Sequence, residues 1–596
     1  MEQHPTTITA ALIGQARTRA GCPAFTTYDG EGGLHCMTYG ELLDRSLRVA
    51  SALQDRGLRQ GDRLLICLPT GPEVLLAIYG TLLAGGVCVP VYPPTANRGL
   101  RRWKERMAAV AQVAQPCGAV VATAGSASRL HMASVLELVA PDLFTVGFEA
   151  LERERYTAPA VTTPERDLAF VQFTSGTTQR PRGVSITHSG LMANIRALLE
   201  VMPLTEGDVS VSWLPPYHDM GLVGHIFVPV HCGVHQHLLP PRVLQRRPRR
   251  WLQLISATHA TQTTAPNFAY SVCARRISRP ERAALDLGAL RWALNGAEMV
   301  HVETLRAFSD TFGACGFDPE AFRPVYGLAE ATLTATFSPR GGATVDWIDR
   351  ERFATDGVAR PARGVDAMPI VSVGCPIPGH ELKIVSPTTG RRRASGEVGE
   401  VCLRGPSLMQ GYFNNPQATA EVLRGGWLHT ADLGYLHEDG MLYITGRTKD
   451  LIIKGGRNYL PQDFETACLD IRGLRPGRTV AFGLANKSSG TEDIVVVAEV
   501  RDPARTRDPV LLQRVVRTVA ERTGVRPDRV ELASPGVLPK TTSGKLQRGR
   551  VKSAFETGTQ RPLRSPPRNW VDGVLESVHS GLNFVLSKIN RRLGWQ

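Results

Sequence analysis

A short polar loop has the composition of a phosphate-binding site. It follows the β-type run LAFVQF, precedes QRPRG with its two arginines, and consists of Thr174, Ser175, Gly176, Thr177 and Thr178. Hydroxyls, exposed backbone N–H groups and guanidiniums are the groups that bind a polyphosphate. A Ser/Thr/Gly cluster alone is more often a flexible loop, so the preceding strand and the following arginines support the interpretation. The sequence contains neither G-x-x-x-x-G-K-[ST] nor G-x-G-x-x-G, so the P-loop and dinucleotide folds lose their usual signatures.

Four further motifs each end or follow an apolar run, where open α/β sheets place their ligand-binding loops. They are SWLPPYHDMGLVG (212–224), APNFAY (265–270), NGAE (295–298) and YGLAEAT (326–332). Glu330 is a candidate Mg²⁺ ligand, because magnesium on nucleotide phosphates takes one or two protein carboxylates. His218 and Asp219 could form an acid/base pair, but adjacent residues rarely face each other, so we expect them to line a pocket.

Three charged residues late in the chain suit the chemistry of a nucleotide. Asp432 lies in WLHTADLGYL, Arg447 in ITGRTKD and Lys545 in PKTTSGKLQR. A carboxylate can accept both ribose hydroxyls, an arginine can bind a phosphate bidentately, and a lysine ammonium can stabilise charge on a carboxylate and an α-phosphate. Only nine of the 69 basic residues are Lys, and seven of those nine lie at or after position 449. Because Lys is so rare in this chain, a Lys on a Ser/Thr/Gly loop is a stronger candidate for a functional residue than it would be elsewhere.

The elements that must position these residues follow from hydrophobic patterning. From Leu64 to about Thr430, apolar β-type runs alternate with longer amphipathic segments, which predicts a parallel, helix-covered sheet in an α/β protein. We expect a large domain over residues 1–446, a small mobile α+β domain over 447–555, and a Pro/Arg linker with an amphipathic tail helix over 556–596. An apolar heptad stripe at 571–593 predicts that helix, which could bind a partner, dimerise, lie on a membrane surface or pack on the chain itself.

Composition limits the classes of function. The 596 residues are 42% hydrophobic and 21% charged, which excludes wholesale disorder. The net charge of +14 would suit nucleic acid, a membrane surface or an acidic partner, but no nucleic-acid-binding pattern accompanies it, so we expect none bound. The eleven Cys include no C-x-x-C pair, which favours free, buried thiols. The uncharged run 74–92 is interrupted by Gly85-Gly86 and ends in prolines, so we predict a buried helix and strand in a cytoplasmic protein.

Taken together, the motifs resemble the adenylate-forming superfamily of acyl-CoA synthetases, luciferases and peptide-synthetase adenylation domains. The resemblance extends from about Thr38 to Arg548. Within the superfamily, the sequence motifs are most similar to those of the fatty acyl-AMP ligases. The motifs concerned are PVYPP (90–94), SWLPPYHDMGL, APNFAY, YGLAEAT and GRNYLPQDFE. This resemblance implies that a fatty acid is activated with ATP and Mg²⁺ to acyl-AMP. The acyl group would then be transferred to an acyl carrier protein for lipid, polyketide or lipopeptide synthesis. The resemblance also implies an insertion in the large domain, expected at about 338–372.

The resemblance assigns a role to each candidate. Thr174 to Thr178 would hold the β- and γ-phosphates, with Glu330 and Thr174 at the metal. Asp432 would hold the ribose, Arg447 the ribose and α-phosphate region, and Lys545 the acyl carboxylate. Lys449 would be the hinge of the small domain. The adenine would be framed by Asn295, Gly296, Ala297, Glu298, Tyr326 and Gly327, and the substrate pocket lined by His218, Asp219, Gly221, Phe268 and Tyr270.

This sequence departs from the superfamily pattern in three places. Gln179 and Arg182 stand where the phosphate loop usually has Gly and Lys, although Arg182 keeps the charge. Ala431 replaces the Gly before Asp432, which could narrow the ribose turn. None of these changes removes a charged group, so we still expect activity.

Three other functions stay open at this stage. A fatty acyl-CoA synthetase would use the same motifs. An amino-acid adenylation enzyme uses an Asp to hold the α-amino group, and Asp219 could serve that purpose. A non-catalytic scaffold is the third, although Glu330, Asp432, Arg447 and Lys545 all being present argues against it.

Overall fold

The computed structural model divides the chain into two compact units. The first comprises residues 1–460 and 540–545, and the second comprises 461–539 and 546–596. The structure describes all residues except 1–4, 30–31, 95–99, 123–142, 153–163, 175–180, 365–366, 487–490, 541–544 and 558–596. The predicted tail helix at 571–593 therefore lies outside the described residues. No helix among the described residues is long and apolar enough to span a membrane.

A seven-stranded sheet carries the polar loop. Its order is β20-β8-β7-β4-β3-β5-β6, with β7, β4, β3, β5 and β6 parallel and β8 and β20 antiparallel at one edge. The bounds are β3 Arg63–Cys67, β4 Val87–Pro90, β5 Gly118–Val121, β6 Phe144–Gly147, β7 Leu168–Phe173, β8 Gly183–Thr187 and β20 Gly411–Tyr412. The uncharged run at 74–92 forms most of α3 (Pro72–Leu83) and all of β4, as predicted. Pro72 at the first turn suits a helix start, since proline has no N–H to leave unpaired there.

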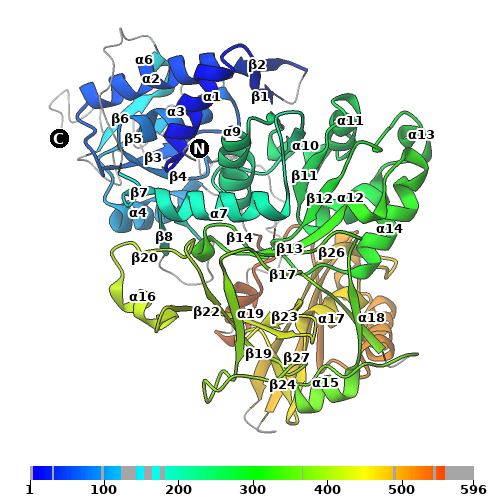
Figure 1. Ribbon diagram of the computed structural model, residues 1–596. Helices are drawn as coiled ribbons and strands as arrows, with labels where there is room; N and C mark the ends of the chain where they lie inside the picture. The colour runs from blue at the N-terminus through cyan, green and yellow to red at the C-terminus, as the bar shows by residue number, and fades with distance from the viewer. Residues whose placement is uncertain are drawn as a thin grey trace, which may run out of the picture. The chain divides into compact units, whose positions relative to one another are not determined.

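Helices cover this sheet. In Figure 1, α1, α2 and α3 lie together beside β3 to β6. The side chain of Thr38 caps α2 in a capping box with Glu41, which satisfies two N-terminal groups reciprocally. The helices of this region are α1 Ile8–Thr18, α2 Tyr39–Asp55, α4 Leu100–Ala114 and α6 Phe148–Glu152.

A nine-stranded sheet carries most of the other motifs. Its order is β17-β14-β13-β12-β11-β9-β10-β1-β2, with six neighbouring strands from β13 to β1 parallel and antiparallel strands at both edges. The bounds are β1 Pro23–Tyr28, β2 Leu34–Thr38, β9 Val209–Ser212, β10 His235–Leu238, β11 Gln262–Ala265, β12 Trp292–Asn295, β13 Phe322–Gly327, β14 Thr334–Phe337 and β17 Cys375–Pro376. The two sheets confirm the predicted α/β class, with a parallel, helix-covered body.

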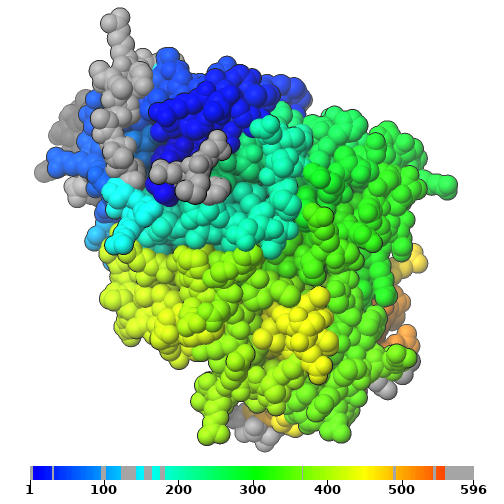
Figure 2. Space-filling model, viewed as in Figure 1, coloured from blue at the N-terminus to red at the C-terminus, as the bar shows by residue number. Residues whose placement is uncertain are grey.

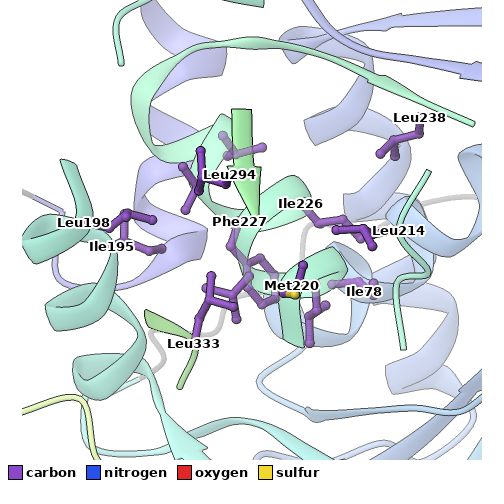
Figure 3. Close-up of a cluster of buried hydrophobic side chains, with 14 of the residues drawn as sticks. Ile78, Ile195, Leu198, Leu214, Met220, Ile226, Phe227, Leu238, Leu294 and Leu333 are labelled. Carbon is purple, nitrogen blue, oxygen red and sulfur yellow. The ribbon is translucent and has the colours of Figure 1, made fainter. Parts of the chain in front are cut away.

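The helices around this sheet are short. They are α7 His188–Val201, α8 Asp219–Leu222, the π-helix η1 Val223–Phe227, α9 Val228–Cys232, α10 Pro241–Arg246, α11 Arg249–Ala257, α12 Asn267–Arg276, α13 Arg279–Arg282 and α14 Val302–Phe312, with 3₁₀ turns η2 Gly313–Cys315, η3 Pro319–Ala321 and η4 Ala329–Ala331. Figure 3 shows part of the core between them, where side chains from α7 (Ile195, Leu198) and the α8–η1 segment (Met220, Phe227) approach Leu333. The end of the 212–224 motif therefore lies in the hydrophobic core, which holds the motif in position.

The segment beyond Glu381 is antiparallel, so the prediction of a parallel sheet up to residue 430 is wrong there. The five strands are β18 Glu381–Val385, β19 Gly399–Arg404, β21 Leu423–Arg424, β22 Trp427–Leu436 and β23 Leu442–Arg447, with α16 Pro416–Val422 between them. Short connections such as the one between β22 and β23 permit only antiparallel pairing, because a parallel crossover needs a dozen or more residues. Figure 2 shows the yellow-green surface around 405–425 meeting the cyan surface of 183–201, consistent with the β20–β8 pairing.

Residues 345–371 fold as a separate hairpin. β15 (Val345–Asp349) pairs antiparallel with β16 (Ala367–Val371), with α15 (Arg350–Asp356) between them. Ile348 and Phe353 pack with Tyr435 and Tyr443 of the five-stranded sheet. β24 (Ile452–Lys454) and β25 (Arg457–Tyr459) complete the first unit. That this hairpin is the expected family insertion stays a prediction.

The second unit is a small α+β fold, as predicted for the C-terminal region. Its sheet has the order β26-β27-β28, with one antiparallel and one parallel pair. The elements are α17 Pro461–Ala467, β26 Leu474–Asn486, β27 Thr491–Val500, the 3₁₀ turn η5 Pro503–Arg507, α18 Pro509–Thr523, β28 Arg529–Ala533 and α19 Arg548–Glu556. Phe482 and Phe555 pack edge to face at 5.3 Å in its core.

Candidate active site

The ends of β7 and β8 hold the polar loop in a hairpin. The backbone N–H of Thr174 donates to the carbonyl of Arg182 at 3.2 Å, and Nη2 of Arg106 donates to the carbonyl of Thr174 at 3.1 Å. Ser175, Gly176, Thr177, Thr178 and Gln179 lie outside the described residues. The structure therefore fixes both ends of the candidate phosphate loop and brings the Arg106 guanidinium to one of them.

Glu330 is connected to the base of this loop through a residue that the sequence analysis did not identify. The hydroxyl of Tyr412 donates to Oε1 of Glu330 at 2.9 Å, and the guanidinium of Arg182 lies over the Tyr412 ring, 5.1 Å from its centroid. Burial raises the pKa of Glu330, the bond from Tyr412 opposes that shift, and the charges of Asp219 and Asp432 add to it. A half-buried carboxylate with a raised pKa gains from a nearby cation, so Glu330 fits the predicted metal role.

Asp432, Arg447 and Tyr326 come together as a hydrogen-bonded group. Asp432 and Arg447 are register partners on β22 and β23, and Nε of Arg447 donates to Oδ1 of Asp432 at 2.8 Å. The hydroxyl of Tyr326, at the end of β13, donates to Oδ2 at 2.7 Å. Burial, followed by the Asp432 charge, raises the pKa of Tyr326 well above its usual value, and Asp432 raises the pKa of Arg447. The side chain of Arg447 remains 58% exposed, so its remaining donors face solvent.

Lys545 lies within electrostatic range of several predicted site residues. Burial lowers the pKa of its ammonium, while Asp219, Glu298 and Asp432 raise it. These groups belong to the first unit, which includes residues 540–545. Lys449 also lies in the first unit, where burial and then Arg447 lower the pKa of its ammonium. The structure thus brings Lys545 to the carboxylates, and the role of Lys449 as a hinge stays a prediction.

The side chains of His218 and Asp219 approach each other closely, although Nδ1 of His218 has no hydrogen-bond partner of good geometry, and their role in lining the pocket stays a prediction. Nδ1 of His218 lies 2.5 Å from Oδ1 of Asp219, and the N–H of Met220 donates to the same oxygen at 2.8 Å. Asp219 begins α8, so its side chain folds back onto the first turn of a helix while the preceding residue is still extended. Burial raises the pKa of Asp219, but His218, Lys545 and the Met220 N–H outweigh it, and the pKa is lowered overall.

The NGAE segment begins with Asn295, the last residue of β12, and its polar side chains are only partly hydrogen-bonded. The Asn295 side chain is fully buried and donates to Oδ1 of Asn267 at 3.4 Å. Oε1 of Glu298 accepts from the N–H of Phe268 at 2.6 Å, in the first turn of α12. Gly296 is buried, whereas Ala297 is partly buried. Oδ1 of Asn295 has no hydrogen-bond partner among the described residues, so this amide oxygen and the partly buried Ala297 are the parts of the segment that could contact a ligand.

The predicted pocket residues divide into surface and core. Phe268 is half-buried, with its ring 6.0 Å from Trp213 and Nζ of Lys540 at 6.0 Å from its centroid. Tyr270 is instead a core residue: its ring packs edge to face against Phe308 and Phe322, and its hydroxyl donates to the carbonyl of Leu294 at 2.8 Å. These contacts also let Tyr270 position β12, and its place in the substrate pocket stays a prediction.

Backbone geometry is unusual at this site. Among the six described non-glycine residues with positive φ are Ala297, Thr332 and Ala431, which all lie in predicted motifs. Such conformations concentrate at functional sites because the surrounding structure must impose them. Two positions require glycine because another backbone carbonyl oxygen lies close by. A Cβ on Gly327 would lie 1.8 Å from the carbonyl oxygen of Leu333, and one on Gly221 would lie 2.0 Å from that of Pro215.

Residues 14–413 match the AMP-binding enzyme family. A putative acyl-CoA synthetase of Caulobacter vibrioides is 34% identical, over 93% of this chain and 96% of its own. The medium-chain-fatty-acid–[acyl-carrier-protein] ligase JamA of Moorena producens is also 34% identical, over 89% of this chain and 92% of its own. A solved structure from studies of fatty acyl-adenylate ligases from E. coli and L. pneumophila superposes with a TM-score of 0.85 at 32% identity, covering 94% of this chain and 98% of that one.

The chain therefore belongs to the AMP-binding enzyme family, and it is an adenylate-forming ligase by fold and by motif. The names of the relatives include both a carrier-protein ligase and an acyl-CoA synthetase.

Proposed function

We propose that this protein is a fatty acyl-AMP ligase. It activates a fatty acid with ATP to give the acyl-adenylate and pyrophosphate, and it then transfers the acyl group to the phosphopantetheine thiol of an acyl carrier protein. The observation that carries adenylation is the hydrogen-bonded Asp432–Arg447 pair, with Lys545 within electrostatic range of Asp219 and Asp432. One ammonium and one guanidinium so placed suit a reaction between a carboxylate and an α-phosphate.

ATP would be held from several elements at once. The loop at 174–178, with Arg182, would bind the β- and γ-phosphates, and Asp432 would accept the ribose hydroxyls. Arg447 reaches the same region with its exposed donors. The adenine would lie against the backbone of 296–297 and the ring of Tyr326. Glu330 and Thr174 would hold Mg²⁺, which neutralises phosphate charge when bound.

In the first half-reaction an oxygen of the fatty acid carboxylate attacks the α-phosphorus. The new bond joins that oxygen to phosphorus, and the bond from phosphorus to the β-phosphate oxygen breaks to release pyrophosphate. Lys545 would hold the two anionic reactants together, which removes much of the entropic barrier of a bimolecular step. In the second half-reaction the carrier thiolate attacks the acyl carbonyl, forming the C–S bond and releasing AMP.

A fatty acid is favoured over an amino acid as the substrate. Oδ1 of Asp219, the candidate for holding an α-amino group, already contacts His218 and accepts from the Met220 N–H. The side chains around 212–224 are apolar: Trp213, Leu214, Met220 and Leu222 are all buried. The relatives named for fatty acids support the same choice.

An acyl-CoA synthetase is the second candidate, supported by the name of the Caulobacter vibrioides relative. Both candidates share the adenylation step and differ in the thiol that accepts the acyl group. With a carrier protein as acceptor, the product would supply lipid, polyketide or lipopeptide synthesis.

A substrate panel tests the proposal. The enzyme is incubated with ATP, Mg²⁺ and single acids, and acyl-AMP is measured by mass spectrometry for fatty acids of several chain lengths and for the common amino acids. We expect acyl-AMP from fatty acids only. Amino-acid adenylates exceeding fatty acyl-adenylates would replace the proposal with an amino-acid adenylation enzyme, and no adenylate from any acid would favour a scaffold.

A further inference from the structure

Three side chains of different chemistry converge on one point of the five-stranded sheet. Glu400 and Cys402 are two residues apart on β19, and His429 on β22 is the register partner of Cys402. Nδ1 of His429 lies 2.9 Å from Oε2 of Glu400 and 3.4 Å from Sγ of Cys402. The three ligand atoms lie within 4.8 Å of one another, and no other trio of His, Cys, Asp or Glu side chains in the described part of the chain is so arranged.

A β-bulge produces this convergence. Glu400 pairs with Leu433 while Cys402 pairs with His429, so β22 contains two extra residues over this span. Ala431 lies in the bulge with φ 59°, and its N–H donates to Oε1 of Glu400 at 3.0 Å. The backbone thus holds one carboxylate oxygen and directs the other at His429. Bulges commonly redirect side chains in this way beside functional sites.

The geometry excludes a nucleophile–histidine–acid triad. Such a triad needs the nucleophile and the acid on opposite ring nitrogens. Here Cys402 and Glu400 both approach Nδ1, and a single Nδ1 proton can be donated well to only one of them. A thiol, an imidazole nitrogen and a carboxylate oxygen that share one position can all be satisfied at once by a cation, which takes an electron pair from each.

We propose that Glu400, Cys402 and His429 form a binding site for a divalent ion of the zinc class, separate from the magnesium site at Glu330. Thiolate, imidazole and carboxylate are the usual zinc ligands, and tetrahedral zinc places its sulfur and nitrogen ligands about 3.5 Å apart. The observed separation of Sγ and Nδ1 is 3.4 Å. Three protein ligands leave the fourth position to water or another ligand, as in open zinc sites.

Access and local charge are compatible with an ion. Cys402 is buried, while the side chains of Glu400 and His429 are each 18% exposed, so an ion can enter from their side. Lys383, the register partner of Cys402 on β18, places its ammonium 4.0 Å from the centroid of the Trp427 ring. This cation–π contact holds the lysine charge against the indole ring, within electrostatic range of Cys402.

Cobalt titration of the full-length protein, stripped of metal by a chelator, tests the site. We expect one equivalent of Co²⁺ to give a thiolate-to-cobalt charge-transfer band that Zn²⁺ abolishes and excess Mg²⁺ does not change. Cys402→Ser removes the band, and His429→Gln weakens Zn²⁺ binding at least about tenfold in competition with a chromophoric chelator. The matched controls are Cys36→Ser, at an exposed cysteine, and His437→Gln, which breaks a His–Asp pair 3.2 Å apart outside the three-residue group; both keep the band.

Two results would overturn the proposal. Wild-type protein that shows no charge-transfer band with Co²⁺ has no thiolate site, whatever the variants do. A band that survives in Cys402→Ser and disappears in Cys36→Ser would place the metal on the exposed cysteine.

Discussion

Lys545 is the residue on which adenylation depends most directly in this account. Its ammonium interacts with Asp219, Glu298 and Asp432, and no other element supplies a cation to Asp219 and Asp432 together in the proposed mechanism. We predict that Lys545→Ala lowers the rate of acyl-AMP formation by about a hundredfold or more, the range seen when one group that stabilises transition-state charge is removed.

The measurement is single-turnover acyl-AMP formation together with equilibrium binding of ATP. Binding of ATP should change little, because the loop at 174–178 and the Asp432–Arg447 pair remain. Lys552→Ala is the matched control, since Lys552 pairs with Glu492 at 3.5 Å in the second unit. An adenylation rate in Lys545→Ala equal to that of the control would refute the assignment.

Ala431 allows a second test at this scale, because an exposed alanine occupies a left-handed conformation with φ 59°. That conformation disfavours alanine by about 1–2 kcal/mol, and glycine loses about 0.4–1 kcal/mol more entropy on folding. We therefore predict that Ala431→Gly raises the free energy of unfolding by about 0.5–1 kcal/mol in urea denaturation. Ala10→Gly, at an exposed position of α1, should lower it by about 0.5–1 kcal/mol. If Ala431→Gly and Ala10→Gly lowered the free energy of unfolding equally, the backbone at Ala431 would not be strained.

Residue types predicted part of the site, and three-dimensional neighbours determined the rest. Asp432 and Arg447 could be selected because each is charged and lies in a strand-end motif, and the structure joins them at 2.8 Å. Tyr270 is buried among aromatic rings, and its motif alone does not distinguish a core position from a pocket position. Tyr412 and the Glu400–Cys402–His429 group could not be predicted from neighbouring residues in the sequence. Tyr412 is 82 residues from Glu330, and His429 is 27–29 residues from Cys402 and Glu400.

At the scale of elements, the pairing of β20 with β8 joins the end of the proposed phosphate loop to Glu330, the proposed metal ligand. Tyr412 is opposite Val184 in this pair, which places its hydroxyl on Glu330 and its ring under Arg182. Short edge strands of this kind cannot be predicted from hydrophobic alternation, because two residues carry no period. The central parallel strands could be predicted, since they are longer apolar runs that are buried on both faces.

Tyr412→Phe tests this link through the pKa of Glu330. The Tyr412 hydroxyl lowers that pKa against the effect of burial, so the variant should raise it further. In the proposed mechanism Glu330 must be ionised to bind Mg²⁺, so activity should be lost as the pH falls through its pKa. The acid limb of the kcat/KM profile for MgATP should therefore move to higher pH in Tyr412→Phe.

The control for this experiment is Tyr28→Phe, which removes a hydroxyl that bonds to His237 at 3.0 Å in the nine-stranded sheet. Its profile should match that of the wild type. A Tyr412→Phe profile with the acid limb unchanged would show that Tyr412 does not influence Glu330.

At the scale of the whole molecule, buried histidines make stability depend on pH. Burial lowers the pKa of His188 and of His225 to about 4, and that of His237 to about 3. His225 lies in the π-helix η1, with Nδ1 at 3.3 Å from Ser210 Oγ and 3.2 Å from Gln236 Oε1. An unfolded histidine titrates near 6.5, so between about pH 6.5 and 4 the unfolded state binds more protons than the folded state. Their contribution to stability is thus complete above pH 6.5 and is lost as the pH falls toward 4.

We predict that the free energy of unfolding falls between pH 7 and pH 5 and that His225→Gln reduces the slope. One histidine contributes at most about 1.4 kcal/mol per pH unit within this window. The measurement is urea denaturation at several pH values, with His35→Gln, at an exposed position, as the control. A slope unchanged by His225→Gln would mean that this histidine is already protonated in the folded protein.

The central claim concerns the acceptor of the acyl group, and a competition measures it directly. Enzyme that has formed acyl-AMP from the preferred fatty acid is offered equal concentrations of a holo acyl carrier protein and of CoA, and both thioesters are quantified by mass spectrometry. The account predicts acyl-carrier protein as the main product, with little acyl-CoA. Efficient formation of acyl-CoA at the expense of the carrier product would contradict it and establish the protein as an acyl-CoA synthetase.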